Sequence, residues 1–308
     1  MPDIRIRTDD EAGRITLDRA EALNAVTYEM CLEIAKALED WRDQDRVKLI
    51  LIDAEGDRAF SAGGDIRELF DTGTAGNYRY GQKFWFDEYR MNAAIAEYPK
   101  PFVSFLQGFT MGGGVGIGCH AGHRIVGESS QIAMPECGIG LVPDVGGTHL
   151  LSGAPGHLGE FLGMTGTRMG PADAIHCGFA DLFVPEDHWD HLKSALCVTG
   201  DVTVLERAKQ DPPPSPHSDI EQADIDRVFS LPSAAAIRKA LATSEMPYAA
   251  RALKGLDAGA PLSVACALAM VRSARSNSGL RDALKTEYRF THRAMEHGDF
   301  LEGIRAQV

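Results

Sequence analysis

Short apolar segments that alternate with helical patterns constrain the fold of this chain more than any other feature. Apolar runs of strand length occupy residues 4–7, 13–17, 47–53, 102–106 and 123–126. The run VKLILID at 47–53 contains four consecutive apolar residues, which is typical of a strand buried inside a sheet. Because helical patterns separate these runs, the sequence predicts an α/β fold.

Local signals mark where two of these helices begin or end. Residues 27–42 carry apolar side chains at helical spacing, and Thr27 stands where an N-cap is expected. A second helix is expected over residues 84–98. Pro99 and Pro101 follow it and disfavour its continuation, so we expect the helix to end there.

A proline-rich segment divides the chain. The stretch QDPPPSPHS at 209–217 combines prolines with polar residues and favours neither helix nor sheet. Beyond it, helical patterns continue to the end of the sequence. We therefore expect a core domain over residues 1–208, a linker at 209–217 and an all-helical C-terminal region over residues 218–308.

Composition excludes several classes of function. The 308 residues include 31 Lys or Arg and 44 Asp or Glu, and the resulting net charge of −13 argues against a nucleic-acid or anionic-membrane partner. No apolar run approaches the length of a membrane span. The six cysteines are scattered, which predicts reduced thiols, and the N-terminus MPDIRIRTDDEAG resembles no targeting signal. We expect a cytoplasmic protein.

Two glycine-rich segments are candidates for contact with a ligand. They are SAGGD at 61–65 and TMGGGVG at 110–116. Consecutive glycines let backbone N–H groups approach a ligand closely, so the two segments could form an oxyanion hole around one carbonyl oxygen. The alternative is that the glycines serve only turns and close packing. Neither segment has the order of a P-loop or of a dinucleotide fingerprint, so a nucleotide site is not supported.

Two acids stand in apolar surroundings within AMPECGIGLVPDVGG at 133–147. Each of them, Glu136 and Asp144, directly follows a proline. Taken singly, each could cap a turn or helix, Asp144 especially, as an N-cap. Taken with the two glycine segments, they suggest a carboxyl pair that activates water. The histidines lack the spacing of a zinc site, so packing or surface roles are expected for them and no metal is expected.

Three segments together resemble the crotonase (enoyl-CoA hydratase/isomerase) superfamily, whose members handle acyl-CoA thioesters. They are LDRAEALNAVTYEM at 17–30, FSAGGDIRELF at 60–70 and GFTMGGGVGIG at 108–118. The resemblance implies a ββα spiral core with a helical C-terminal region. It also implies that the N–H groups of Gly64 and Gly113 hold the thioester oxygen. Further substrate-binding residues implied by it are Ala22, Ala62, Asp65, Ile66 and Gly112.

Within the superfamily the chain is most similar to the 3-hydroxyisobutyryl-CoA hydrolase group of valine catabolism. The stretches that carry this are AGGDIR at 62–67, EYRMN at 88–92, residues 133–147 and TEYRFTHRAMEHGDFLEGIRA at 286–306. The hydratases carry a catalytic glutamate where this chain has Gly116, and the hydrolases use a second acid where it has Asp144. The resemblance therefore implies thioester hydrolysis by Glu136 and Asp144.

Two other functions remain open in the sequence. One is hydration or isomerisation of an enoyl-CoA by a single glutamate, Glu136. The other is a non-catalytic CoA-binding protein, since a fold does not determine a function. The resemblance further implies an acyl-CoA substrate, no cofactor apart from the CoA of that substrate, and a homo-oligomer, either a trimer or a hexamer.

Overall fold

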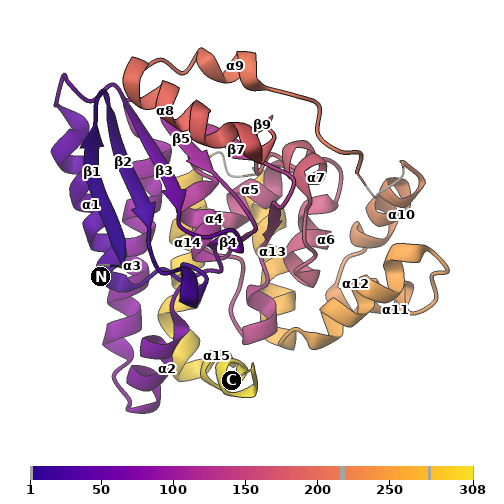
Figure 1. Cartoon of the computed structure of the whole chain (residues 1–308). Coiled ribbons are helices and arrows are strands. Elements are labelled where there is room, and N and C mark those ends of the chain that lie inside the picture. Colours follow the sequence, from indigo (N-terminus) through magenta and orange to yellow (C-terminus); the bar gives the residue numbers. More distant parts are fainter. Residues whose placement is uncertain (1–2, 216–218, 277–278, 308) are drawn as a thin grey trace.

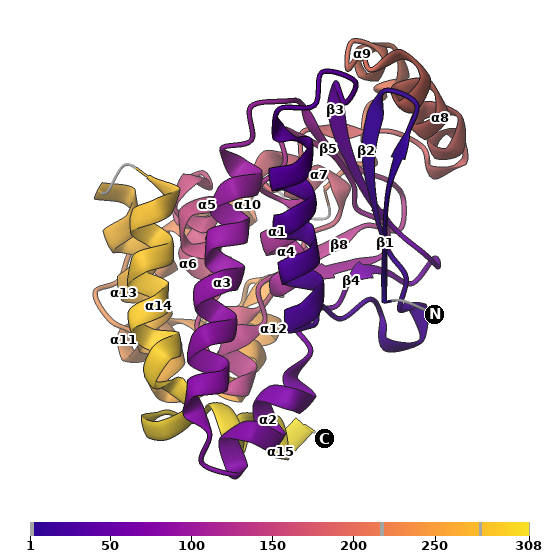
Figure 2. The same cartoon turned by 90° about the vertical axis from the view of Figure 1, so that its left-hand side faces the viewer.

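Two β-sheets form the centre of the molecule. The computed structural model describes residues 3–215, 219–276 and 279–307. The larger sheet has the order β1-β2-β3-β5-β7-β9 and the smaller one β4-β6-β8; only the β1–β2 pair is antiparallel (Figures 1 and 2). The strands are β1 Ile4–Asp9, β2 Ala12–Leu17, β3 Leu49–Ala54, β4 Ala59–Ser61, β5 Phe102–Phe105, β6 Phe109–Met111, β7 His123–Val126, β8 Gln131–Ala133 and β9 Leu182–Phe183. The five predicted strands are confirmed, with ends displaced by at most two residues.

The larger sheet separates two hydrophobic clusters, and β3 contributes to both. Ile50 and Ile52 pack into the main core with α1 (Tyr28–Arg42) and α3 (Tyr78–Ala96). Leu49 and Leu51 point to the opposite face, where they pack with buried side chains of α8 (Trp189–Thr199). Successive side chains of a strand face opposite sides of the sheet, so the apolar run at residues 49–52 can pack against both clusters.

The chain repeats one path through the two sheets. Each turn places a strand in the larger sheet, then one in the smaller sheet, then a helical segment. The three turns are β3–β4 followed by α2 (Ile66–Thr74) and α3, β5–β6 followed by α4 (Gly113–Gly118), and β7–β8 followed by η2 (Glu136–Ile139) and α5 (Gly147–Gly153). This path is the expected ββα spiral core.

Helix ends follow the local signals in part. Thr27 caps α1, since its hydroxyl accepts the N–H of Met30 at 3.2 Å. Helix α3 ends before Pro99 as predicted but begins at Tyr78 rather than at residue 84. The predicted start was too late because Gly81, within the first turns of α3, is a poor helix former. A Cβ at Gly81 would lie 2.5 Å from Met295 Cε, so this glycine allows α3 to pack closely against the C-terminal part of the chain.

The C-terminal region is helical, as expected, and packs onto the core. Helix α14 (Leu280–His297) runs beside α3, and α15 (Phe300–Gln307) contacts α2 and η2 (Figure 2). One cluster of buried apolar side chains includes both Ile4 and Ile304. The remaining helical segments are η1 Ala20–Ala22, α6 Leu158–Thr165, α7 Pro171–His176, η3 Glu186–His188, α9 Val204–Ala208, α10 Asp219–Phe229, α11 Ala234–Leu241, α12 Pro247–Ala258, α13 Pro261–Ser276, α14 Leu280–His297 and α15 Phe300–Gln307.

The proposed division into core, linker and C-terminal region stays a prediction. Residues 211–215 have neither helix nor strand, in keeping with a linker, and residues 216 and 217 lie outside the described part of the chain. Among the described helices, none is by itself long and apolar enough to cross a membrane. The pair α12–α13 passes that test only when it is counted together across a bend of 115°.

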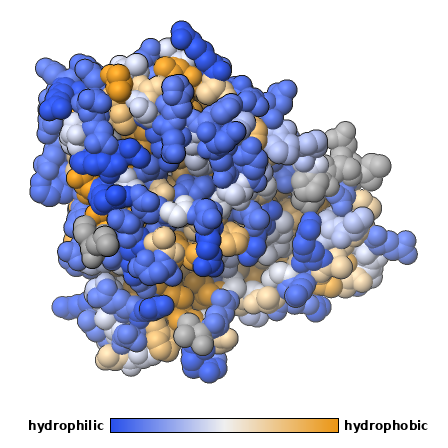
Figure 3. Space-filling view, viewed as in Figure 1, coloured by the Kyte–Doolittle hydropathy of each residue, from blue (hydrophilic) through white to orange (hydrophobic). Residues whose placement is uncertain are grey.

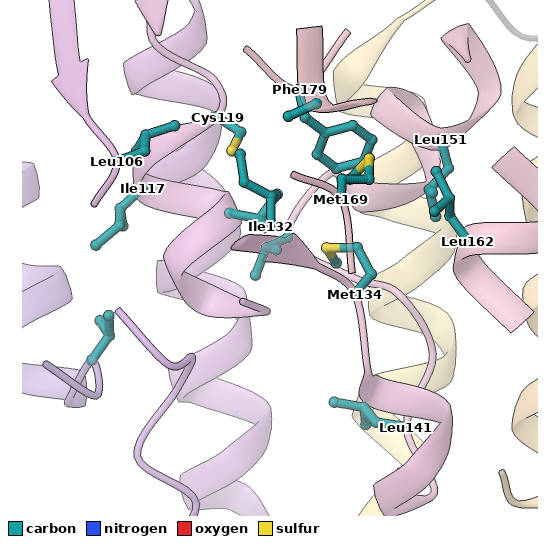
Figure 4. Close-up of a cluster of buried hydrophobic side chains, with 14 of the residues drawn as sticks. Leu106, Ile117, Cys119, Ile132, Met134, Leu141, Leu151, Leu162, Met169 and Phe179 are labelled. Carbon is teal, nitrogen blue, oxygen red and sulfur yellow. The ribbon is translucent and has the colours of Figure 1, made fainter. Parts of the chain in front are cut away.

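The surface is mostly hydrophilic on the face shown in Figure 3, with a hydrophobic area in its lower centre near α15. Beneath the surface, apolar side chains from separate elements form a continuous core. In the view of Figure 4, Ile132 and Met134 lie between Cys119 on one side and Leu162 of α6 on the other, and all four are buried. Met134 directly precedes the Pro135–Glu136 turn, so this core anchors a segment that the sequence singled out.

Candidate active site

A cavity of about 250 Å³ lies where both glycine-rich segments meet α3, η2 and α15. It is lined on the C-terminal side by Phe300 and Gln307 of α15. Seven of the site residues expected from the sequence are among its lining residues: Ala62, Gly64, Ile66, Gly112, Gly113, Glu136 and Asp144. The structure thus brings together residues that are up to 82 positions apart in the sequence.

Two expected substrate-binding residues, Ala22 and Asp65, lie outside the cavity lining. Ala22 ends the short helix η1, and the residue after it, Leu23, accepts the N–H of Ala62 at 2.9 Å. The carboxylate of Asp65 caps α2 and forms an ion pair with Arg19 at 3.0 Å. Both residues therefore lie next to the first glycine-rich segment but outside the cavity lining.

The first glycine-rich segment is held by backbone hydrogen bonds on either side of Gly64. The N–H of Val26 donates to the carbonyl of Gly63, and the N–H of Asp65 donates to the carbonyl of Val26, both at 2.8 Å. These bonds fix the backbone around Gly64, which lines the cavity. The position of its own N–H group is therefore set before any ligand binds.

The second glycine-rich segment is a helix start rather than a loop. Gly112 has φ 49° and ψ −119°, a conformation open only to glycine, and α4 begins at Gly113. A Cβ on Gly113 would lie 3.0 Å from the Gly64 nitrogen, so the two glycines are in contact. The N–H of a first helical residue has no partner inside its helix. The amides of Gly64 and Gly113 are thus close enough to point at one oxygen atom.

Glu136 begins the short helix η2 and is only 5% exposed. A Cβ on Gly112 would lie 2.8 Å from its Oε1 atom, so the carboxyl group packs against the second glycine-rich segment. Its Oε2 atom is buried and has no hydrogen-bond partner among the described residues. Burial raises the pKa of Glu136 well above its ordinary value, and the neighbouring Asp144 carboxylate raises it further.

Asp144 is 4% exposed and has a specific partner. The hydroxyl of Tyr89, on α3, donates to its Oδ2 atom at 2.6 Å. Burial raises the pKa of Asp144 to about 7, although the hydrogen bond from Tyr89 opposes that rise. Asp144 is not an N-cap, since α5 begins at Gly147 and its N-cap is Gly146. The capping interpretation of Asp144 is therefore wrong.

A third carboxyl group lines the cavity, and sequence reasoning missed it. Glu88, on α3, is 3% exposed, and a Cβ on Gly113 would lie 3.2 Å from its Oε1 atom. Burial raises the pKa of Glu88 well above its ordinary value, and the Asp144 charge adds to that effect. The signal was present in EYRMN at 88–92, where an acid and a tyrosine occupy buried helix positions.

Gly116 leaves no room for a further acid at this site. It is fully enclosed in α4, where a Cβ would lie 2.8 Å from both Asn92 Nδ2 and Val145 Cβ. Side chains almost never approach so closely, so a larger residue here must displace its neighbours. The position at which the resemblance implies a second glutamate in the hydratases is therefore tightly packed in this chain.

Within the described residues, no three His, Cys, Asp or Glu side chains are grouped as a metal site would require. His120 is buried, and its Nε2 atom lies 2.7 Å from the carbonyl oxygen of Val145. That contact is a packing role of the kind expected from the sequence.

Curated relatives share most of the chain. The 3-hydroxyisobutyryl-CoA hydrolase, mitochondrial, of Xenopus tropicalis is 37% identical over 96% of this chain and 79% of its own length. The 3-hydroxyisobutyryl-CoA hydrolase 1 of Arabidopsis thaliana is 35% identical over 95% of this chain and 80% of its own. The expected resemblance to this hydrolase group is confirmed.

Two solved structures have nearly the same fold. An enoyl-CoA hydratase from Rhodobacter sphaeroides is 53% identical with a TM-score of 0.94, covering 100% of this chain and 89% of that one. A carnitinyl-CoA dehydratase from Mycobacterium thermoresistibile is 39% identical with a TM-score of 0.96, covering 100% and 90%. Each superposes along the whole chain, so the helical C-terminal region belongs to the shared fold.

The expected cytoplasmic location is contradicted by these relatives, since the vertebrate hydrolases are named as mitochondrial proteins. The expectation depended on scattered cysteines and a polar N-terminus, and neither property is specific to one compartment.

A family model described as enoyl-CoA hydratase/isomerase matches residues 12–308, which include every strand except β1 and all of the cavity lining. The spiral core, the paired glycine segments and the relatives matched over 95–96% of this chain all agree with this family assignment. The chain belongs to the enoyl-CoA hydratase/isomerase family.

Proposed function

We propose that this protein hydrolyses an acyl-CoA thioester, and specifically 3-hydroxyisobutyryl-CoA. The observation that carries the proposal is one cavity lined by Glu136, Asp144, Gly64 and Gly113, in a chain that has a tightly packed glycine at position 116. The names of the relatives in Xenopus and Arabidopsis support the same activity and substrate.

The proposed reaction begins with a water molecule that attacks the thioester carbonyl carbon. Asp144 takes the proton of that water, because the Tyr89 hydroxyl stabilises its ionised form while Glu136 Oε2 has no such donor. The N–H groups of Gly64 and Gly113 hold the oxyanion of the tetrahedral intermediate. The C–S bond then breaks, and protonated Glu136 donates its proton to the departing CoA thiolate, leaving the free acid and CoA-SH.

Thiol release tests this function directly. The protein is mixed with 3-hydroxyisobutyryl-CoA, and free CoA is followed with a thiol reagent. We expect steady release by the wild type and a loss of at least about 100-fold in kcat for Glu136→Gln and for Asp144→Asn. The matched control is Glu160→Gln, which alters a fully buried acid on α6 outside the cavity lining and keeps kcat. Absence of release by the wild type would refute the proposal.

Hydration of an enoyl-CoA is the second candidate, because the solved structure from Rhodobacter sphaeroides carries the name enoyl-CoA hydratase. A hydratase that used Glu136 alone would consume an enoyl-CoA without releasing thiol. The lack of a carboxyl side chain at position 116 favours hydrolysis, since a two-glutamate hydratase would need one there. Parallel assays on an enoyl-CoA and on 3-hydroxyisobutyryl-CoA separate the two activities. Binding of CoA by calorimetry with no turnover of either compound would instead indicate a non-catalytic binding protein.

The proposal includes two properties that follow from the resemblance. The reaction needs no cofactor apart from the CoA of the substrate, so activity should persist after treatment with a chelator and dialysis. The protein is expected to form a trimer or a hexamer, which light scattering in solution measures.

A further inference from the structure

The backbone directly after Asp144 is strained. Val145 has φ 52°, in the left-handed region that β-branched residues strongly disfavour. Gly146 follows with φ 81°, so the chain makes two successive left-handed steps between Asp144 and α5. A conformation of this kind persists only where surrounding contacts enforce it. The contacts that enforce this one therefore also determine where the Asp144 carboxylate lies.

Those contacts come mainly from one side chain of the C-terminal region. Glu287, on α14, is fully buried, and its Oε2 atom accepts the N–H of Gly146 at 2.8 Å. Its Oε1 atom accepts the N–H of Thr148 at 3.0 Å and also the hydroxyl of Thr148. Three donors thus converge on the two oxygens of one carboxylate, which spans the turn from Gly146 into α5.

The strained residue is held from its other side by His120. The His120 Nε2 atom lies 2.7 Å from the Val145 carbonyl oxygen, so this nitrogen carries the proton and donates it. A Cβ on Gly146 would lie 2.6 Å from the same imidazole ring. Glu287 and His120 therefore both form hydrogen bonds to the backbone that follows Asp144: Glu287 to the Gly146 and Thr148 amides, and His120 to the Val145 carbonyl.

The same face of α14 also reaches the hydrogen-bond partner of Asp144. Thr291, one turn beyond Glu287, has its Oγ1 atom 3.3 Å from the Tyr89 hydroxyl, which donates to Asp144. Glu287 itself is not among the residues that line the cavity. It contacts the loop that carries a catalytic acid, not the space that the substrate would occupy.

We propose that Glu287 is a positioning residue for the reaction: its carboxylate holds the Gly146 and Thr148 amides and so aims Asp144 into the cavity. This inference rests on the proposed hydrolysis of a thioester. It assigns a catalytic contribution to the C-terminal helix α14 through a hydrogen-bonded contact that joins residues 141 positions apart.

The test is Glu287→Gln, measured with the thiol-release assay. Glutamine has the same shape but one acceptor oxygen, so at least one of the two amides loses its partner and faces an NH₂ group instead. Displacement of Asp144 should lower kcat by about 10- to 100-fold, while KM changes less than about threefold because the cavity walls are unchanged. Hydrogen exchange at the Gly146 and Thr148 amides should become faster.

The control Glu160→Gln removes charge from another fully buried glutamate, one that pairs with Arg275 of α13 at 2.8 Å. It is expected to lower thermal stability as Glu287→Gln does, yet to keep kcat and the exchange of the Asp144 loop. A purely structural role for Glu287 would make the two variants alike, with equal loss of stability and wild-type kcat in the folded protein. That result would overturn the inference.

Two further results separate the possible failures. If the wild type releases no thiol, the proposed function fails, whatever Glu287 does. If Glu287→Gln does not fold, Glu287→Asp keeps the charge but shortens the side chain, which draws both oxygens away from the Gly146 and Thr148 amides. Its kcat is then expected to fall about three- to tenfold at unchanged KM, and a wild-type kcat in that variant would equally refute the positioning role.

Discussion

We expect the hydrogen bond between Tyr89 and Asp144 to set the pH at which the proposed hydrolysis begins. Tyr89→Phe removes one hydroxyl and leaves the ring in place. Asp144 must be ionised to accept a proton from water, so activity is lost as the pH falls through its pKa, which burial raises to about 7. Without the donated hydrogen bond that pKa rises further, and the acid limb of kcat/KM must move to higher pH.

The size of the shift follows from the environment of the bond. The oxygens are 2.6 Å apart and both side chains are buried, which makes this a well-shielded hydrogen bond to a charged group. A hydrogen bond to a charged group contributes about 1.5–3 kcal/mol. Each pKa unit corresponds to about 1.4 kcal/mol, so the acid limb should rise by about one to two pH units. Burial raises the pKa values of the neighbouring acids Glu88, Glu136 and Glu287, and the Asp144 charge raises them further.

The assay is thiol release measured across pH for the wild type and the variant. At high pH, where Asp144 is ionised in both, kcat should recover to within about tenfold of the wild type. Tyr98→Phe is the matched control, since its hydroxyl donates to the Leu38 carbonyl at 2.8 Å and to no carboxylate. An acid limb that stays in place or moves to lower pH in Tyr89→Phe would refute the role given to this hydrogen bond.

Three further outcomes are expected. Asp144 is protonated in the folded state and ionised in the unfolded state between its ordinary pKa of 3.8 and about 7, so its burial costs stability as pH rises through that range, by at most about 4 kcal/mol. Urea unfolding should therefore show Asp144→Asn gaining stability over the wild type at pH 8 relative to pH 4. Gly116→Ala should lose about 1–3 kcal/mol in the same experiment, whereas Gly153→Ala, with open space at its Cβ, should change by less than about 1 kcal/mol. Gly112→Ala places a Cβ 2.8 Å from Glu136 Oε1 at a positive φ, so both folding stability and thiol release should fall.

Local signals predicted the features that depend on local chemistry. Thr27 caps its helix because the preference is a property of its own hydroxyl and the amide three residues on. Helix α3 ends before Pro99 for an equally local reason, since a proline disfavours continuation of a helix. The two glycine-rich segments could be recognised as candidate ligand contacts because the conformational freedom of glycine is a property of the residue itself.

The buried acids of the helices were harder to predict because their partners lie far along the chain. Glu88 shares a helix face with Phe84 and Asn92, and an acid in a helix normally indicates a face that is exposed to solvent. Glu287 shares a face with Ala283, and its partner amides are 139 and 141 residues away. In each case an acid interrupts an otherwise apolar or small-residue stripe. That interruption is the signal in the sequence, and only tertiary contacts show what it means.

Gly116 and the Asp144 loop are two consequences of one constraint. The Val145 side chain occupies the space that a Cβ at Gly116 would need, 2.8 Å from it, and Val145 lies there because its backbone is left-handed. A glutamate at position 116 would push Val145 away, and the peptide held by Glu287 would move with it. The two arrangements of acids cannot therefore coexist in this chain: a side chain at 116 displaces the loop that aims Asp144. Introducing a glutamate by Gly116→Glu should abolish thiol release without creating hydratase activity, unless a second substitution also makes room for the Asp144 loop.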